Sequence, residues 1–229
     1  MFSWTAAFNR ETALFFTKWM RDVSAASSLE KGVPHIVPDI QGTYSSAVWS
    51  DAAVVIPWVV YQTYGDERIL EENWKCMHAW VDYIHNHVNE NGLWMSGYQY
   101  GDWLALDREM GDKSVGATDV YFVANASYIY VTDLVAKTAR VLKKYGEAAY
   151  YEVLREETLK SFREEYYTSR GRIVSETQTG AILSLYFHLA REKDRKRILQ
   201  TLKTNIENHK NHLATGFVGT PYLCHTLSE

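Results

Sequence analysis

The stretch Ala52-Ala-Val-Val-Ile-Pro-Trp-Val-Val-Tyr61 has no polar residue on any side. A helix that is apolar all round is buried in the core of a protein. We therefore expect this segment to form a fully buried helix, with a kink at Pro57 because proline removes a backbone hydrogen bond. Ser45 or Ser46 is the expected N-terminal cap.

The next segment has a different pattern, because one face is apolar and the other is charged. Within residues 67–87 the apolar face carries Ile69, Leu70, Trp74, Met77, Trp80, Val81 and Ile84. This spacing predicts an amphipathic helix on the outside of the fold. The tight turn at Gly65-Asp66 makes the two helices antiparallel neighbours.

The same alternation recurs along the chain. Nearly apolar segments are 120–131 and 181–190, and amphipathic segments are 147–167 and 194–208, with shorter helices expected at 2–8, 11–22 and after Pro221. Long connections at 23–44, 88–117, 168–176 and 209–220 each precede an apolar segment. Helices joined by short turns are antiparallel, so we expect every long connection to emerge at one end of the fold.

This pattern predicts an all-α fold, an (α/α)6 barrel or toroid of alternating inner and outer helices. About four inner helices are present, so we expect residues 1–229 to be one domain, the central part of a barrel truncated at both ends. The alternative is a helical solenoid, whose repeats would recur at a fixed period. The long connections differ widely in length, which favours the barrel.

The longest connection, 92–119, is rich in glycine and interleaves aromatic residues with acids. They are Trp94, Tyr98, Tyr100 and Trp103, with Asp102, Asp107, Glu109 and Asp112. A long loop in a compact fold indicates function, and rings beside carboxylates suit sugars. The alternative is a structural loop whose rings cover the ends of neighbouring helices.

The composition narrows the possible partners. A net charge of -4 argues against nucleic acid, which needs clustered Lys and Arg. The basic run 191–197 also contains Glu192 and Asp194, which indicates a solvated helix face. No apolar segment approaches membrane-spanning length and Met1 is not followed by a leader pattern, so we expect a soluble chain.

Neither a metal site nor a cofactor is expected. Cys76 and Cys224 have no metal-ligand spacing and are predicted to be core thiols. The pair His209 and His212 is too short a match to indicate a metal. Asn125-Ala-Ser127 fits a glycosylation acceptor but lies in an apolar helical segment.

Six motifs, in order, resemble the bacterial α-L-rhamnosidase catalytic domain along essentially the whole chain. They are Val33-Pro-His-Ile-Val-Pro-Asp39, Val48-Trp-Ser-Asp-Ala-Ala53, Tyr100-Gly-Asp-Trp-Leu-Ala105, Val115-Gly-Ala-Thr-Asp119, Glu176-Thr-Gln-Thr179 and Gly216-Phe-Val-Gly-Thr-Pro221. All six fall on the long connections or the helix starts beside them.

The resemblance implies a glycoside hydrolase that releases terminal α-L-rhamnosyl groups with inversion. It implies that Trp49 and Trp103 are aromatic walls of the sugar subsite. Asp51 and Asp102 are then nearby acids that bind hydroxyl groups or orient the rings. The alternatives are core packing for Trp49 and a first-turn helix acid for Asp51; Asp119 is interpreted as a helix cap.

The sequence departs from the family pattern at three points. The family's general acid lies in an Asp-Glu-Arg-Leu-Gly-Trp-type motif that would precede Met1, and its general base is a Glu that would follow Glu229. No catalytic residue is therefore assigned in this chain, and the chain alone is expected to be inactive. Ser50 replaces the glycine of the family's Trp-Gly-Asp-Ala pattern, a change that we expect to be tolerated.

Two other classes of function remain open. One is a different (α/α)-barrel glycosidase or lyase, and another is a non-catalytic carbohydrate-binding module or a helical scaffold. The expected partners are rhamnose-containing glycosides or polysaccharides. Self-association is also expected if inner helices are exposed at the truncated edges.

Overall fold

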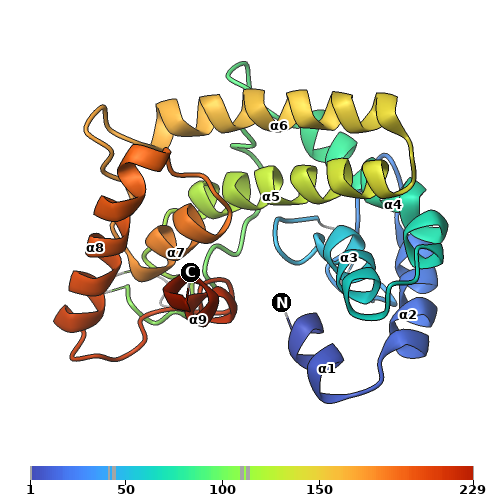
Figure 1. Cartoon of the computed structure of the whole chain (residues 1–229), viewed down its shortest axis with the longest axis horizontal. Coiled ribbons are helices and arrows are strands. Elements are labelled where there is room, and N and C mark those ends of the chain that lie inside the picture. The colour runs from blue at the N-terminus through green and yellow to red at the C-terminus, as the bar shows by residue number, and fades with distance from the viewer. Residues whose placement is uncertain (1, 41, 43–44, 109–110, 112–113, 229) are drawn as a thin grey trace. The chain divides into compact units, whose positions relative to one another are not determined.

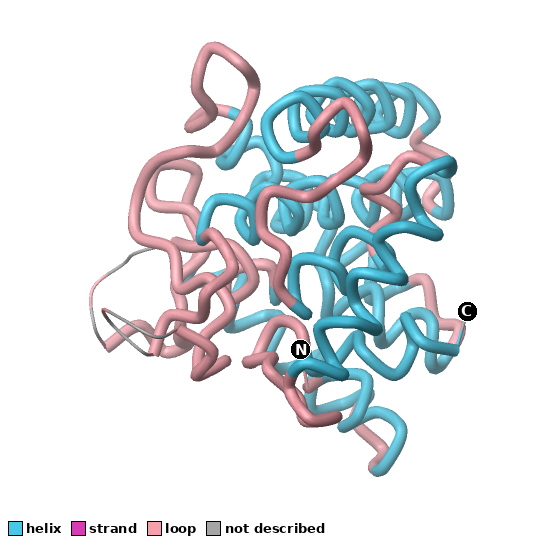
Figure 2. The backbone as a smooth tube through the Cα atoms, turned by 90° about the vertical axis from the view of Figure 1, so that its left-hand side faces the viewer, coloured by secondary structure: helices cyan, strands magenta, loops and turns pink. Residues whose placement is uncertain are grey.

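The computed structural model describes residues 2–40, 42, 45–108, 111 and 114–228. In these residues the regular secondary structure is helical, and strand-like pairing is limited to three isolated bridges. Figure 2 shows helices in cyan joined by loops in pink. The chain divides into two compact units, Met1–Tyr98 with Ser127–Glu157 and Gln99–Ala126 with Thr158–Glu229.

Unit 1 contains the four N-terminal helices of Figure 1. They are α1 (Ser3–Asn9), α2 (Ala13–Ala26), α3 (Ala52–Tyr64) and α4 (Arg68–His85). The later part of α5 (Val120–Val141) and the earlier part of α6 (Tyr145–Tyr166) also belong to unit 1. Helix α3 packs against α1, α2 and α4, so it is the central element of this unit.

Helix α3 confirms the predicted buried segment but begins differently from the prediction. Its positions 53–57, 59 and 60 are buried, and the helix continues through Pro57. The predicted cap at Ser45 or Ser46 is wrong, because α3 begins at Ala52 after Asp51. The Ser45 hydroxyl instead donates to the carbonyl oxygens of Lys31 at 2.7 Å and Val33 at 2.9 Å, within the preceding loop.

Helix α4 is amphipathic, as its apolar spacing predicts. It buries Ile69, Leu70, Met77, Trp80, Val81 and Ile84, together with Asn73 and Cys76. Its outer side is fastened to α6, where the Tyr151 hydroxyl donates to Asp82 at 2.8 Å. Burial and the neighbouring Asp82 raise the pKa of Tyr151, so Tyr151 remains a hydrogen-bond donor.

Unit 2 contains the C-terminal helices α7 (Gln178–Tyr186), α8 (Glu192–Asn208) and α9 (Thr220–Ser228). Helix α7 is buried from position 178 to 185 and packs against both α8 and α9. Its first turn is capped by Thr177, whose hydroxyl oxygen accepts from the Gly180 backbone N–H at 3.0 Å. The buried, apolar character predicted for this segment is confirmed.

The remaining parts of α5 and α6 complete the core of unit 2. Phe122 of α5 lies 5.1 Å from Phe162 and 5.2 Å from Tyr166 of α6, measured between ring centroids. Asp119 caps α5, accepting from the Phe122 backbone N–H at 2.7 Å, as the sequence predicts. Asn125 is fully buried within α5, so it is not an accessible glycosylation acceptor.

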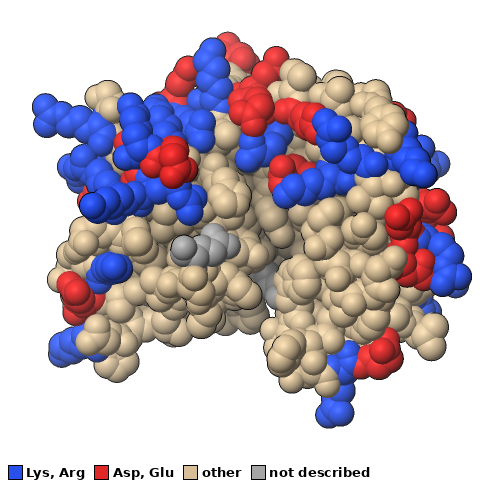
Figure 3. All heavy atoms as spheres, viewed as in Figure 1, with Lys and Arg blue, Asp and Glu red and all other residues tan. Residues whose placement is uncertain are grey.

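The surface confirms one prediction and corrects another. The run 191–197 forms the first turns of α8, and its Lys193, Lys196 and Arg197 are exposed. On the face in Figure 3, basic side chains are interspersed with acidic ones.

Cys76 is buried, but Cys224 is exposed on α9 and is therefore not a core thiol. No described helix is long and apolar enough to cross a membrane.

Candidate functional site

The first candidate group is in unit 1, where Asp51 holds the loop that carries Trp49. Asp51 is 3% exposed, and its Oδ1 accepts from the indole N–H of Trp80 at 2.8 Å. Its Oδ2 accepts from the Val48 backbone N–H at 2.7 Å and from the Ser127 hydroxyl. One carboxylate therefore joins the loop to α4 and α5.

The backbone beside Trp49 has an uncommon conformation. Val48 has a φ of 72°, a left-handed value that is unfavourable for a β-branched residue. The bond from its N–H to Asp51 fixes this conformation. Such conformations cost about 1–3 kcal/mol and concentrate at functional sites. Asp51 therefore bonds to the backbone immediately before Trp49.

Ser50 connects the first two motifs of the sequence. Its hydroxyl donates to the Val33 carbonyl oxygen at 2.7 Å and accepts from the Ser46 backbone N–H at 3.1 Å. Ser50 is fully buried with both bonds made, which explains why serine is accommodated where the family pattern has glycine. The 33–39 and 48–53 motifs are thus tied to each other within unit 1.

The protonation of Asp51 reflects its burial. Removal from water raises the pKa of the Asp51 carboxyl above its ordinary value, and the bonds from Ser127, Trp80 and Val48 oppose that rise. Burial, which disfavours the charged form, is the largest of these effects. His35 in the same loop region has its pKa lowered by burial, with Asp39 opposing the change.

The second candidate group is in unit 2, where Asp102 holds the loop that carries Trp103. Asp102 is 0% exposed. Its Oδ2 accepts from the Gly216 backbone N–H at 2.8 Å and from the Thr179 hydroxyl. Its Oδ1 accepts from the backbone N–H groups of Val218 at 2.8 Å and Gly219 at 3.2 Å. Four donors therefore converge on one carboxylate.

Close backbone approach makes glycine necessary around Asp102. A Cβ atom on Gly216 would lie within 3.0 Å of the Trp103 carbonyl oxygen, and one on Gly219 would lie equally close to the Thr179 hydroxyl. The Phe217 N–H donates to the Trp103 carbonyl oxygen at 2.9 Å. The 216–221 segment thus lies directly against the backbone of Trp103.

Four of the six motifs meet in this way. The Gly116 N–H donates to the Asp102 carbonyl oxygen at 3.3 Å, and the Thr118 and Thr177 hydroxyls share a hydrogen bond of 2.6 Å. Segments 100–105, 115–119, 176–179 and 216–221 are therefore connected within unit 2. The predicted convergence of the long connections is observed here for the three that belong to this unit.

The predicted site residues occupy two kinds of environment. Trp49 and Trp103 are half-buried, while the carboxylates of Asp51 and Asp102 are buried and accept from the protein itself. The Trp49 and Asp51 pair lies in unit 1, and the Asp102 and Trp103 pair lies in unit 2.

Of the other acids named in the long loop, Asp107 is the one that the structure describes. Asp107 accepts from the Ala117 N–H at 2.7 Å. Glu109 and Asp112 lie outside the described residues. Among the described residues, no group of three or more His, Cys, Asp and Glu side chains lies close enough to hold a metal ion.

Sequence reasoning missed the partners of both aspartates. Trp80 was expected only as a member of an apolar face, and Ser127 only as part of an apolar helical segment that contains a glycosylation acceptor sequence. Thr179 belongs to a quoted motif but was given no role. Trp80 and Ser127 carry no local signal, because they lie 29 and 76 residues from Asp51 in the sequence.

The alternation of buried and amphipathic helices is that of an (α/α)6 barrel, and solved structures agree. The chain matches the Aspergillus terreus α-L-rhamnosidase with a TM-score of 0.88 and 33% identity, covering 95% of this chain and 26% of that one. It matches the Streptomyces avermitilis α-L-rhamnosidase complexed with L-rhamnose with a TM-score of 0.89 and 33% identity, covering 99% and 21% respectively.

Sequence comparison gives the same family. An α-L-rhamnosidase of Formosa agariphila is 35% identical over 100% of this chain and 25% of its own length. The family model for the bacterial alpha-L-rhamnosidase 6 hairpin glycosidase domain matches residues 1–229. The chain belongs to this family. It spans about a quarter of the length of that curated relative.

Proposed function

We propose that this chain forms part of the catalytic domain of a glycoside hydrolase that releases terminal α-L-rhamnosyl groups with inversion. One observation carries the proposal beyond family membership. Each motif tryptophan, Trp49 and Trp103, lies within two residues of a buried aspartate that fastens its loop through several hydrogen bonds. Held rings of this kind are suited to recognising a rigid ligand, because little conformational entropy is lost on binding.

The two residue types have different roles in this proposal. In each unit the motif tryptophan, Trp49 in unit 1 and Trp103 in unit 2, offers an aromatic wall suited to the C–H groups of a sugar. Asp51 and Asp102 orient those walls rather than bind sugar hydroxyls, because their oxygens are buried and already accept from the protein. Loss of either carboxylate is therefore expected to weaken sugar binding through the loop.

The chemistry of inversion requires two further carboxyl groups. One protonates the leaving oxygen and the other activates water, and they stand about 6.5–9.5 Å apart. Asp51 is 3% exposed and Asp102 is 0% exposed, so neither carboxyl group is accessible to a substrate. By the resemblance of the motifs, both catalytic groups belong to segments of the parent protein that this sequence does not contain.

Release of p-nitrophenol from p-nitrophenyl α-L-rhamnoside tests the proposal. We expect no release by this chain and release by the full-length parent, with β-L-rhamnose as the first product in NMR. In the parent, Trp103→Ala is expected to lower kcat/KM by about 100-fold, because misplaced substrate costs rate steeply. Trp4→Ala is the control, since Trp4 is an exposed tryptophan of α1 outside the motifs.

Other outcomes identify other functions. Hydrolysis by the parent of a different glycoside alone would indicate another barrel glycosidase. Rhamnose binding without turnover would indicate a carbohydrate-binding module. Turnover by this chain alone, abolished by Asp102→Asn, would contradict the assignment of both catalytic carboxyl groups to other segments.

A further inference from the structure

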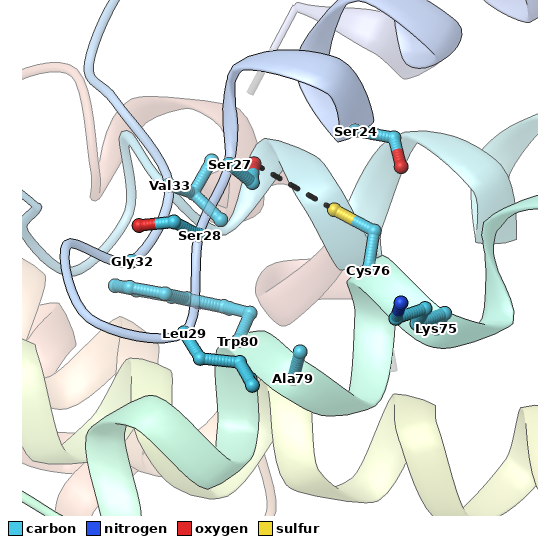
Figure 4. Close-up of a pocket in the computed structure, with 10 residues that line it drawn as sticks. All are labelled: Ser24, Ser27, Ser28, Leu29, Gly32, Val33, Lys75, Cys76, Ala79 and Trp80. Atoms are coloured by element: carbon cyan, nitrogen blue, oxygen red, sulfur yellow. Dashed lines mark hydrogen bonds between the residues drawn. The ribbon is translucent and has the colours of Figure 1, made fainter.

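Unit 1 contains a pocket whose lining includes only Val33 of the motif residues and neither Trp49 nor Asp51. It lies between the end of α2, the turn that follows it and the middle of α4, and its volume is about 240 Å³. Figure 4 shows its lining residues, which come from 24–33 and 75–80. This volume is just below the range of about 300–1,000 Å³ for drug-sized ligands, so the pocket suits a smaller molecule.

The lining is chemically two-sided. In Figure 4, Ser24, Ser27, Lys75 and Cys76 lie on one side, where Val33 and Ser28 lie close to Ser27, and the apolar side chains of Leu29, Ala79 and Trp80 lie on the other. The Cys76 thiol is within 3.8 Å of the Ser27 hydroxyl. Burial raises the pKa of the Cys76 thiol, so this group is neutral. The polar side therefore offers hydroxyl groups and one ammonium group.

The pocket wall is held in shape by backbone bonds. Ser28 and Gly32 bond to each other in both directions, at 3.0 and 2.8 Å. The Ser45 hydroxyl fastens the same turn by donating to the carbonyl oxygens of Lys31 and Val33. Gly32 lies against the Trp80 ring, because an added Cβ would be 3.2 Å from that ring. The turn is thus fixed before any ligand arrives.

We propose that this pocket binds a monosaccharide-sized polyol that has one apolar edge, with a 6-deoxyhexose as the best match. The methyl group and ring C–H groups contact Leu29, Ala79 and Trp80. The ring hydroxyls exchange hydrogen bonds with Ser24 and Lys75 and donate to the Ser27 oxygen, whose own proton is donated to the Val23 carbonyl oxygen at 2.7 Å. The ligand class follows from the lining, and only the choice of L-rhamnose as first probe rests on the proposed function.

Trp80 connects this pocket to the motif region. The same indole that lines the pocket donates to Asp51 at 2.8 Å, and Asp51 fixes the loop of Trp49. A ligand that contacts Trp80 therefore touches the group that positions Trp49. For this reason Trp80 serves as the reporter of binding, and the test variants leave it unchanged.

The test is a titration of this chain, labelled with ¹⁵N at its tryptophan indoles, with L-rhamnose. Single Trp→Phe variants assign the Trp49, Trp80 and Trp103 signals. We expect the Trp80 signal to shift with a dissociation constant in the millimolar range, about that of a ligand held by a few polar contacts. Ala79→Leu, which places three more carbons in the pocket, is expected to weaken this binding by at least about tenfold.

Two further variants and a second sugar sharpen the test. Ala25→Leu is the matched control, because Ala25 is an exposed residue of α2 that does not line the pocket. It should leave the Trp80 titration unchanged. Lys75→Met, at an exposed residue whose change is compatible with folding, should weaken binding about threefold. L-mannose, which adds a hydroxyl to the methyl group, should bind several-fold more weakly, because that hydroxyl would face the apolar side.

The outcomes separate this inference from the proposed function. A Trp80 shift that is lost in Ala79→Leu supports the pocket, even if Trp49 and Trp103 do not respond. A response of Trp49 or Trp103 without a response of Trp80 overturns the pocket and leaves the proposed function standing. An unchanged Trp80 titration in Ala79→Leu, or no response to either sugar, also overturns the pocket.

Discussion

Asp51 in unit 1 and Asp102 in unit 2 do the same task with different partners. Each is a buried acid within two residues of a motif tryptophan, and each fastens a long connection. Asp51 accepts from two side chains and one backbone N–H. Asp102 accepts from three backbone N–H groups and one side chain. Asp51 therefore ties a loop to helices, and Asp102 ties loops mainly to one another.

The difference shows how each anchor, meaning the set of hydrogen bonds to one of these two carboxylates, can be weakened. A side-chain donor is removed by substitution, so the Asp51 anchor depends on Trp80 and Ser127. A backbone donor remains whatever the side chain is, so the Asp102 anchor can be lost only at Asp102 itself or by distortion of the loop. A buried donor left without an acceptor costs about 1–3 kcal/mol.

The largest effect is expected from Asp102→Ala. It leaves three backbone N–H groups and the Thr179 hydroxyl without their acceptor, so the free energy of unfolding should fall by about 3–5 kcal/mol. Urea unfolding followed by circular dichroism measures the change. Asp107→Ala, which removes the acceptor of one N–H, is the control and should cost about 1 kcal/mol. Equal losses would mean that Asp102 is not an anchor.

The next effect is that of Trp80→Phe, which tests the side-chain character of the Asp51 anchor. It removes one donor to the buried carboxylate and some core volume, so a loss of about 2 kcal/mol in the free energy of unfolding is expected. The control is Trp58→Phe, the same change at a half-buried tryptophan of α3, with a smaller loss. If the two variants were equally stable, the bond to Asp51 would contribute nothing.

A smaller effect is expected from Ser50→Gly, which restores the family's glycine. It removes the hydrogen bond to the Val33 carbonyl oxygen, with a cost of about 1 kcal/mol. Ser50→Ala separates this bond from backbone flexibility, because alanine lacks the hydroxyl but not the Cβ. A loss in Ser50→Gly without a loss in Ser50→Ala would assign the cost to the backbone.

The smallest expected effect is the contribution of Asp51 to the pH dependence of stability. Burial raises its pKa in the folded state above the ordinary 3.8, so its protonated form favours folding. That contribution is present below pH 3.8 and is lost as pH rises through the folded-state pKa. The stability of the wild type relative to Asp51→Asn should therefore decrease from pH 3.5 upward in urea titrations. A relative increase would show that the three donors outweigh burial and lower the pKa.

Much of the fold could be predicted because it depends on local patterns. The apolar run at 52–61 and the spacing at 67–87 each specify a burial pattern without reference to distant residues. The cap at Asp119 follows from its own side chain. Ser45 and Ser46 have the same local signal as a cap, yet the loop uses the Ser45 hydroxyl and helix α3 begins later.

The anchors could be predicted only in part. Asp51 and Asp102 were found through the motifs that contain them, but their donors lie up to 76 and 117 residues away. Such distances are decided by packing, which no local pattern records. Cys224 illustrates the same limit, because the predicted core position of this cysteine depends on which face of α9 is covered, and Cys224 is exposed.

The way in which Asp102 holds residues 216–219 has a consequence for divergence. Because Asp102 accepts from backbone N–H groups, the side chains of Phe217 and Val218 are not needed for these hydrogen bonds. Phe217 is 52% exposed. The side chain at position 217 can then be changed while the fold is kept. A library randomised at position 217 should therefore yield folded proteins almost throughout.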